Sequence, residues 1–294
     1  MTGVVRSGRK LIINADGFGF SYGANMAIFE AAAAGAITSI SVNTNFEAVN
    51  QLLLFHATYP HISIGVHLNP IVGKPVSRPE KIPSLLDPNG EFWNGHFLRR
   101  LRLGHIKKDE LLHELTKQTE KVLRMGIPVS HLDSHQNSHL HPWFFPTFLN
   151  VAKATGISRM RAPLHRICIE TGNPRISPLV HYSTHPRTAA RHFYTLCLSR
   201  VARLHGLKMA DRLVAIGHAN GKRKTDYVAW QAVGENLPAG TNEIYCHPGF
   251  PDETLRRYAT YVEERRKEHA ILLSPDFKEI WKRNNIELIS FNEL

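Results

Sequence analysis

The sequence predicts an α/β fold, a (β/α) barrel of about seven to eight mostly parallel strands. Short β-branched runs alternate with helical patterns along the 294 residues, and repetition of strand, helix, strand is typical of a parallel sheet. A chain of this length fits one barrel, so we expect a single domain over residues 1–294. The expected strands cover residues 11–16, 37–44, 63–69, 129–135, 159–163, 212–218, 242–248 and 286–291.

Two stretches have the periodicity of amphipathic helices. In the first, residues 109–126, Gly126 is expected to end the helix. Its apolar face is expected to hold Leu111, Leu112, Leu115, Val122 and Leu123. The second, residues 187–210, is basic, and its apolar side is expected to hold Phe193, Leu196, Cys197, Val201 and Leu204. We favour an ordinary barrel helix with a solvated basic face for this stretch, and the alternative is a contact with a membrane interface.

Residues 70–108 form a long connection that is rich in Pro, Gly and turn dipeptides. Connections of this length are often lids or binding loops, although an insertion without a function fits the sequence nearly as well.

Composition excludes some classes of protein. Hydrophobic residues make up 43% and charged residues 21%, which is ordinary globular usage. The formal net charge of +11 attracts phosphates and anionic headgroups, but no RNA-binding or helix-turn-helix signature supports a nucleic-acid partner.

The cysteines and the N-terminus indicate the compartment. Cys168, Cys197 and Cys246 have no CxxC spacing, so we expect neither a disulfide framework nor a thiolate zinc site. The N-terminal residues MTGVVRSGRK contain no apolar stretch, and no apolar span of 18 residues occurs elsewhere. These features predict a cytoplasmic protein.

Polar residues end four of the apolar strands, 11–16, 63–69, 129–135 and 242–248. In a barrel these carboxyl ends carry the active site. The run HLDSHQNSHLH at 131–141 adds further histidines, and strand alternation lets His135 bind a metal while Asp133 orients a neighbouring group. The sequence therefore predicts a divalent metal site at one rim, with His67 and His135 as ligands and His247 close by.

The sequence resembles the YdjC-like carbohydrate deacetylases, a family that includes chitooligosaccharide deacetylases and hopanoid-associated members. The matching blocks occur in family order: LIINADGFGFSYGANMAI, ITSISVNTNFEA, IGVHLNPIVGKPV, PSLLDPNGEF, SHLDSHQNSHLHP, MRAP and NEIYCHPGFPDETLRRYATYVEERRKE. The resemblance implies a barrel enzyme that uses a divalent cation, zinc or magnesium, to remove an N-acetyl group from an amino sugar.

The resemblance also implies roles for individual residues. His67 and His135 match the metal-binding histidines, and Asp16 matches the first acidic residue of the family's Asn-Ala-Asp-Asp-Phe-Gly block. Arg161 and His247 match positions where a cation and an imidazole stabilise an oxyanion or protonate a leaving amine.

Two positions depart from the family pattern. The second Asp of the family is Gly17 here, and the His expected two places after His135 is Asn137. Asp16 must then complete the metal set or remain free as the base, and Asp133, His139 or water are the other candidates for a third ligand. The alternatives to a deacetylase with a rearranged site are an enzyme of altered chemistry and a carbohydrate-binding relative without turnover. A glycosidase using Asp16 and Asp133 is a more distant alternative.

The expected substrate is an acetylated amino sugar. Contacts with it are expected from Asn14, Asn69, Asp133 and His139, and aromatic contacts from Phe92 and Trp93. The net charge and the basic helix favour a phosphate-linked or lipid-linked sugar over a neutral oligosaccharide. Peripheral membrane contact and homo-oligomerisation are left open.

Overall fold

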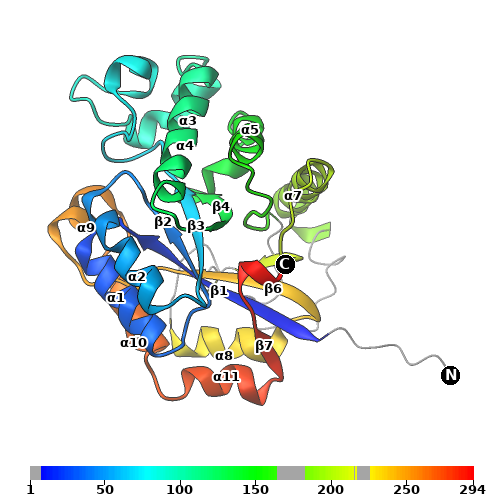
Figure 1. Ribbon diagram of the computed structural model, residues 1–294. Helices are drawn as coiled ribbons and strands as arrows, with labels where there is room; N and C mark the ends of the chain where they lie inside the picture. Colours follow the sequence, from blue (N-terminus) through cyan, green and yellow to red (C-terminus); the bar gives the residue numbers. More distant parts are fainter. Residues whose placement is uncertain (1–7, 164–182, 215, 217–225) are drawn as a thin grey trace.

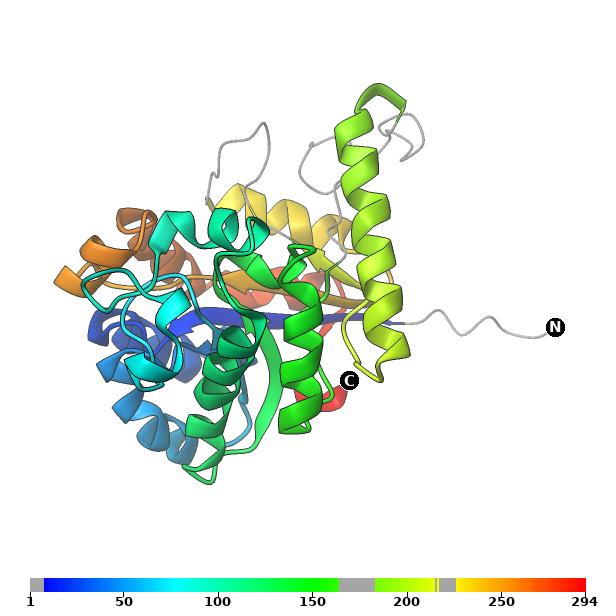
Figure 2. The same cartoon turned by 90° about the horizontal axis from the view of Figure 1, so that it is seen from above.

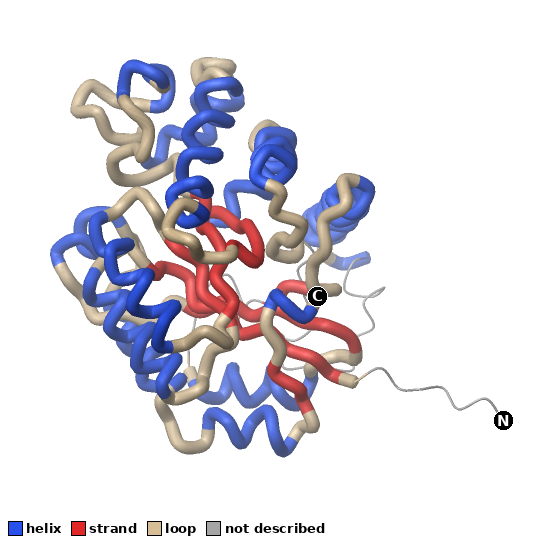
Figure 3. The backbone as a smooth tube through the Cα atoms, in the orientation of Figure 1, coloured by secondary structure: helices blue, strands red, loops and turns tan. Residues whose placement is uncertain are grey.

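The structure, a computed structural model, describes residues 8–163, 183–214, 216 and 226–294. A curled sheet of parallel strands forms the centre, and helices cover its outside (Figure 1, Figure 3). The strands are β1 Arg9–Phe18, β2 Ser39–Val42, β3 Ser63–Leu68, β4 Val129–Ser134, β5 Arg212–Val214, β6 Gly240–Cys246 and β7 Ile286–Leu288. The predicted (β/α) barrel fold is confirmed.

Strand β1 is the centre of the sheet, whose order is β4-β3-β2-β1-β6-β5. One edge of β1 pairs with β6 from Arg9 to Ala15. The other edge pairs with β7 near its start and with β2 from Asn14 onward. The register between β1 and β2 shifts between Asp16 and Phe18, so Gly17 lies in a bulge at the carboxyl end of β1.

The predicted strand over 159–163 forms only isolated parallel bridges. Met160 pairs with Leu132 of β4, and Arg159 pairs with Lys208. Pro163 carries no backbone N–H, which limits further pairing at this point. These bridges nevertheless carry the sheet from β4 toward the segment that precedes β5. Of the predicted strand over 212–218, residues 215, 217 and 218 lie outside the described residues, as does Cys168.

The helices form the outer layer. Their bounds are α1 Tyr22–Ala33, α2 Leu52–Thr58, α3 Phe97–Arg102, α4 Lys108–Leu123, α5 Phe145–Thr155, α7 Pro186–Leu204, α8 Tyr227–Asn236, α9 Glu253–Tyr258, α10 Glu263–Leu272 and α11 Phe277–Arg283. Short 3₁₀ segments are η1 Glu47–Gln51, η2 Pro79–Lys81, η3 Pro83–Leu85, η4 Asn94–His96, η5 His135–Leu140 and η7 Phe291–Glu293.

The two predicted amphipathic helices behave differently. In α4, Leu111, Leu115 and Val122 are buried as expected, whereas Leu123 is exposed because it lies at the edge of that face in the last turn. For α7 the prediction was wrong: the expected apolar side is exposed and does not pack against the barrel. The helix instead packs through residues that are mostly small or polar, namely Thr195, Leu198, Ser199 and Ala202. Among the described residues, no helix combines the length and the apolar character needed to cross a membrane.

Residues 70–108 are a packed insertion on α4. Ile82, Leu85 and Phe97 are buried in the main core. The carboxylate of Glu114 accepts hydrogen bonds from the backbone N–H groups of Val76 and Ser77. Glu114 of α4 therefore satisfies a turn of the insertion. Gly73, Lys74 and Glu91 of the insertion line a cavity.

The side chains of a β-strand alternate between the two faces of the sheet, and the polar ones of β1 face the inside of the barrel. Leu11, Ile13 and Ala15 of β1 pack outward into the main core, whereas Asn14 and Asp16 hydrogen bond to groups inside the barrel. Further down, the ring of His131 stacks on Phe291 of the C-terminal segment, with ring centroids 3.6 Å apart.

Gly65 on β3 makes room for this stack. A Cβ atom at Gly65 would lie 2.3 Å from the nearest ring atom of His131, which is far inside van der Waals contact. The His131 ring cannot move away easily, because Phe291 covers it and both of its nitrogens have hydroxyl neighbours.

Replacing Gly65 by Ala is expected to lower the free energy of unfolding by about 3 kcal/mol, because the added methyl group overpacks the barrel interior. Chemical denaturation of the purified variant measures this change. Gly95→Ala is the matched control, since nothing lies within 4 Å of a Cβ there. Equal stability of the two variants would contradict the packing described here.

Candidate functional site

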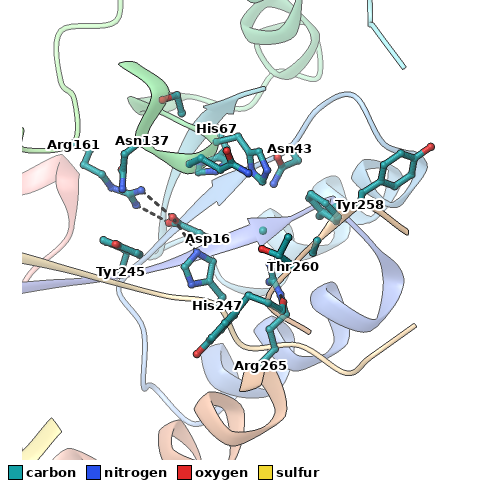
Figure 4. Close-up of a pocket in the computed structure, with 17 residues that line it drawn as sticks. Asp16, Asn43, His67, Asn137, Arg161, Tyr245, His247, Tyr258, Thr260 and Arg265 are labelled. Carbon is teal, nitrogen blue, oxygen red and sulfur yellow. Dashed lines mark hydrogen bonds and ion pairs between the residues drawn. The ribbon is translucent and has the colours of Figure 1, made fainter. Parts of the chain in front are cut away.

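A cavity of about 210 Å³ opens at the carboxyl ends of the strands (Figure 4). Its walls come from β1, from the ends of β3 and β6, from η5 and from the segment between α9 and α10. The lining residues with titratable or amide side chains are Asp16, Asn43, His67, His135, Gln136, Asn137, Arg161, Tyr245, His247, Tyr258, Tyr261 and Arg265. Five predicted site residues, Asp16, His67, His135, Arg161 and His247, therefore lie around one cavity.

Arg161 holds the carboxylates at the bottom of the cavity. Its two terminal nitrogens donate to the two oxygens of Asp16 at 2.8 and 2.6 Å. The same guanidinium contacts Asp133 at 2.9 Å and Glu243 at 2.7 Å. Burial by itself lowers the pKa of Arg161, but these carboxylates outweigh it and raise that pKa well above its usual value. Arg161 is therefore a fixed cation surrounded by acids.

The acids around Arg161 respond differently to burial. Burial raises the pKa of Glu243 to about 7 although the charge of Arg161 opposes the change. For Asp133, burial also favours the neutral form, but Arg161 and His67 outweigh it and hold its pKa well below the usual range. Asp133 is therefore ionised at neutral pH and balances the positive charge of Arg161.

His67 is oriented from below by Asp133. Its Nδ1 lies 2.8 Å from Oδ1 of Asp133, and the Ser41 hydroxyl donates to the other carboxylate oxygen at 2.9 Å. This leaves Nε2 as the ring nitrogen that can face a ligand in the cavity. A carboxylate behind a histidine is the usual way to fix the orientation of a metal ligand. The expectation that Asp133 orients a neighbouring group thus fits the structure.

His135 begins η5, and its ring lies 5.7 Å from the ring of His67. The next two residues, Gln136 and Asn137, have φ angles of 55° and 50°, so the chain turns sharply there. Burial, followed by the charges of His67 and Arg265, lowers the pKa of His135 to about 3. The imidazole is therefore neutral at physiological pH, which is the form that binds a metal.

His247 lines the cavity beside Asp16. Its Nε2 is 3.8 Å from Oδ2 of Asp16, and its ring meets Tyr245 and Tyr261 edge to face. The backbone N–H of His247 donates to Glu268, which also accepts from the Tyr261 hydroxyl at 2.6 Å. Figure 4 shows His247 next to Asp16, with Arg161 on the far side of that carboxylate.

Gly17 stands where the family pattern has a second carboxylate. Its φ angle of 109° falls in a backbone region that residues other than glycine rarely adopt. A Cβ atom there would lie 3.2 Å from the Nη1 atom of Arg265. The position of the missing acid is therefore next to a guanidinium.

The four residues expected to contact a substrate do not line the cavity, and this expectation needs correction. Asn14 and Asp133 are buried beneath it and bond to Ser41, while Asn14 also donates to Asp16 at 2.7 Å. Asn69 accepts from the backbone of the 70–108 insertion. His139 bonds to Ser134 and stacks on Phe148. Each of these side chains hydrogen bonds to other groups of the protein, so it stabilises the structure around the cavity.

The aromatic contacts expected from the insertion are also absent from this cavity. Phe92 is buried in the core. Trp93 donates to the Ser84 carbonyl oxygen at 3.0 Å, and Arg100 lies over its ring. The aromatic residues that do line the cavity include Tyr258 and Tyr261, which sequence reasoning missed. They belong to a block shared with the family, but they follow no strand end, so the rule used to find site residues passed over them.

The structure also identifies a group that can hold a metal ion. Asp16, His67 and Asp133 each offer one ligand atom, and these atoms lie within 4.8 Å of one another. Asp133 takes part through oxygens that already contact His67, Ser41 and Arg161. The chemistry of the donors thus suits a divalent cation near His67 and Asp16.

Replacing Arg161 by Met is expected to lower the free energy of unfolding by about 3–5 kcal/mol, because Asp16, Asp133 and Glu243 would remain buried without their cation. Thermal and chemical denaturation measure the loss. The matched control is Arg256→Met, which breaks an exposed pair with Glu263 and is expected to change stability little. A stable Arg161 variant would mean that the carboxylates do not need this guanidinium.

Comparisons with known proteins identify the family of the chain. The sequence profile of the family described as YdjC-like protein matches residues 10–283. A carbohydrate deacetylase from Thermoanaerobacter pseudethanolicus is 26% identical over 286 residues, which cover 97% of this chain and 99% of that protein. A carbohydrate deacetylase from Listeria monocytogenes serotype 4b is 29% identical over 290 residues, which cover 97% of this chain and all of the relative.

A similar fold occurs in a crystal structure from Enterococcus faecalis V583, of a protein named for a proposed role in cellobiose-phosphate cleavage. The TM-score is 0.77 at 24% identity, and the match covers 98% of this chain and 99% of that chain. Because the family profile spans nearly the whole described barrel, the chain belongs to the YdjC-like protein family.

Proposed function

We propose that this protein is a metal-dependent hydrolase that removes an N-acetyl group from an amino sugar. The observation that carries the proposal is that one cavity is lined by Asp16, His67, His135 and His247. Below it, Asp133 and Glu243 are buried against Arg161. The curated relatives that share about 26–29% identity over nearly the full chain are named carbohydrate deacetylases, which supports the same reaction.

The side chains of the cavity match the needs of amide hydrolysis. Asp16 is the carboxylate that accepts the proton of an attacking water, because it faces the cavity and Arg161 fixes its orientation. His247 is the group that protonates the leaving amine, since its Nε2 lies 3.8 Å from Asp16 and can receive a proton from that side. The tyrosine rings around His247 limit the access of bulk water.

His67 and His135 would hold the metal, with Asp16 left free beside it as the base. The neutral state of His135 and the buried carboxylate behind His67 fit this task. When bound, the metal lowers the pKa of a water and polarises the acetyl carbonyl. Two imidazole ligands favour zinc, whereas water ligands in the remaining positions would suit magnesium.

A second cavity favours a substrate larger than one sugar. It measures about 450 Å³ and shares Phe20 and Tyr258 with the first cavity. Aromatic faces are common platforms for sugar rings, and Tyr22 and Phe46 add two more. We therefore propose that the acetylated unit enters the first cavity and that the rest of a glycoconjugate lies in the second.

The alternative is a carbohydrate-binding protein without turnover. The absence of a carboxylate at Gly17 and the guanidinium of Arg265 beside that position favour it. Such a protein would retain both cavities and bind the same sugars, so measurements of turnover and of sugar affinity separate the two functions.

The decisive experiment measures acetate release from N-acetylated amino sugars after removal of metal by a chelator and addition of zinc or magnesium. The wild type is expected to release acetate, and Asp16→Asn is expected to reduce kcat by about 100-fold or more, because the base is lost. His67→Ala should also lose bound metal, as measured by elemental analysis. His105→Ala, at an exposed histidine far from these residues in sequence, serves as the control. Sugar binding without acetate release under any metal would favour the alternative.

Substitution of Gly17 tests the missing carboxylate. Gly17→Asp and Gly17→Asn impose the same backbone strain, which costs about 1–3 kcal/mol, but only the first adds a negative charge. The Asp variant is expected to bind zinc at least about tenfold more tightly than the Asn variant, because a carboxylate ligand joins the two histidines. Competition with a chromogenic chelator measures both affinities. Equal affinities would show that residue 17 does not face the metal.

A further inference from the structure

Helix α7 has its apolar side turned away from the barrel. Phe193 is 69% exposed and Leu204 is 80% exposed. Leu196, Cys197 and Val201 are exposed as well, and helical periodicity places all five on one face. Figure 2 shows α7 (yellow-green) upright at the edge of the molecule, with its first turns projecting beyond the neighbouring helices.

The packing of α7 does not explain this face. The side of the helix that contacts the barrel carries Thr195, Leu198, Ser199 and Ala202, of which only Leu198 is a large apolar residue. A surface helix of a globular protein normally has the opposite arrangement, with its apolar stripe toward the core. A contiguous apolar surface on a soluble protein usually marks an interaction site.

The charges of α7 identify the chemistry of its partner. The helix contains Arg187, Arg191, Arg200 and Arg203 and has no Asp or Glu between Pro186 and Leu204. Arg200 lies within the apolar face, and Arg203 lies at its border. We propose that this face of α7 docks on a membrane surface that contains anionic lipid, with the apolar side chains at the level of the acyl boundary and the arginines at the phosphates.

The charges also argue against a second copy of this chain as the partner. Two α7 helices packed through this face would bring Arg200 and Arg203 of each copy together, four arginines without one acidic residue of their own. An anionic lipid surface neutralises the same charges, and the formal net charge of +11 adds attraction at longer range.

Helix α7 is close to the site but separate from it. The Tyr194 hydroxyl donates to the carbonyl oxygen of Leu140, the last residue of η5, at 2.7 Å. Within the described part of the chain, α7 contributes no residue to either cavity. The docking surface can therefore be changed without changing the residues proposed to act on a substrate.

Cosedimentation of the full-length protein with vesicles tests the proposal. Vesicles of phosphatidylcholine with 30% phosphatidylglycerol are expected to bind the wild type, and vesicles of phosphatidylcholine alone to bind it at least about tenfold more weakly. The double variant Phe193→Ser, Leu204→Ser and the double variant Arg200→Glu, Arg203→Glu should each reduce binding to the anionic vesicles at least about tenfold. Raising the salt concentration should weaken binding of the wild type.

The matched control is Leu53→Ser with Leu54→Ser on α2, where the two leucines are exposed to a similar degree but lie on another helix. This variant should bind anionic vesicles like the wild type. Circular dichroism and acetate release from a soluble sugar check that every variant is folded and keep this test separate from the proposed reaction. Absence of vesicle binding by the wild type, or equal losses in the α2 and α7 variants, would overturn the proposal. A dimer that dissociates in the α7 variants without vesicle binding would assign the face to a second copy instead.

Discussion

The contact between Arg161 and three buried carboxylates organises the rim of this barrel. Arg161 sits on the segment that joins β4 to the following strands by single bridges, and its acids come from β1, β4 and β6. A buried cation with too few partners, or buried acids without their cation, costs several kcal/mol. Residues 159 and 160 pair only through isolated bridges, so the guanidinium of Arg161 adds contacts that hold β1, β4 and β6 in their relative positions. The same contacts hold the carboxylate of Asp16 at the cavity.

The polar interior explains why many side chains near the site cannot touch a substrate. Inside a barrel, each polar group needs a partner, because water is excluded there. Asn14 and Ser41 satisfy Asp16 and Asp133, and Asp133 in turn orients His67. These contacts limit the freedom of the residues above them, so the groups at the cavity are held in place before anything binds.

The sequence was sufficient to predict the barrel, most of its strands and the convergence of Asp16, His67, His135 and His247, because strand alternation and the rule of carboxyl ends are local. Arg161 was expected near them only from the family resemblance. It could not tell which polar residues face the cavity and which lie below it. Asn69 and His139 have the residue types of a binding site, yet each bonds to a neighbouring turn. Nor could periodicity show that the apolar side of α7 faces outward, because the pattern gives the existence of a face and not its direction. Arg265 contacts the site from a helix distant in sequence, and only the fold brings it next to Gly17.

The position of β1 has a consequence for how the chain folds. This central strand pairs with β2 soon after it in sequence, but its other edge pairs with β6, and the hydrogen bond from Asn242 to the Lys10 carbonyl oxygen joins residues 232 positions apart. Such distant pairing carries a large loop-closure entropy, and high contact order slows folding. During synthesis, β1 must wait for nearly the whole barrel to emerge before both of its edges are covered. Until then Asp16 and its strand have an open edge, so β1 is made before β6 but is completed only with it.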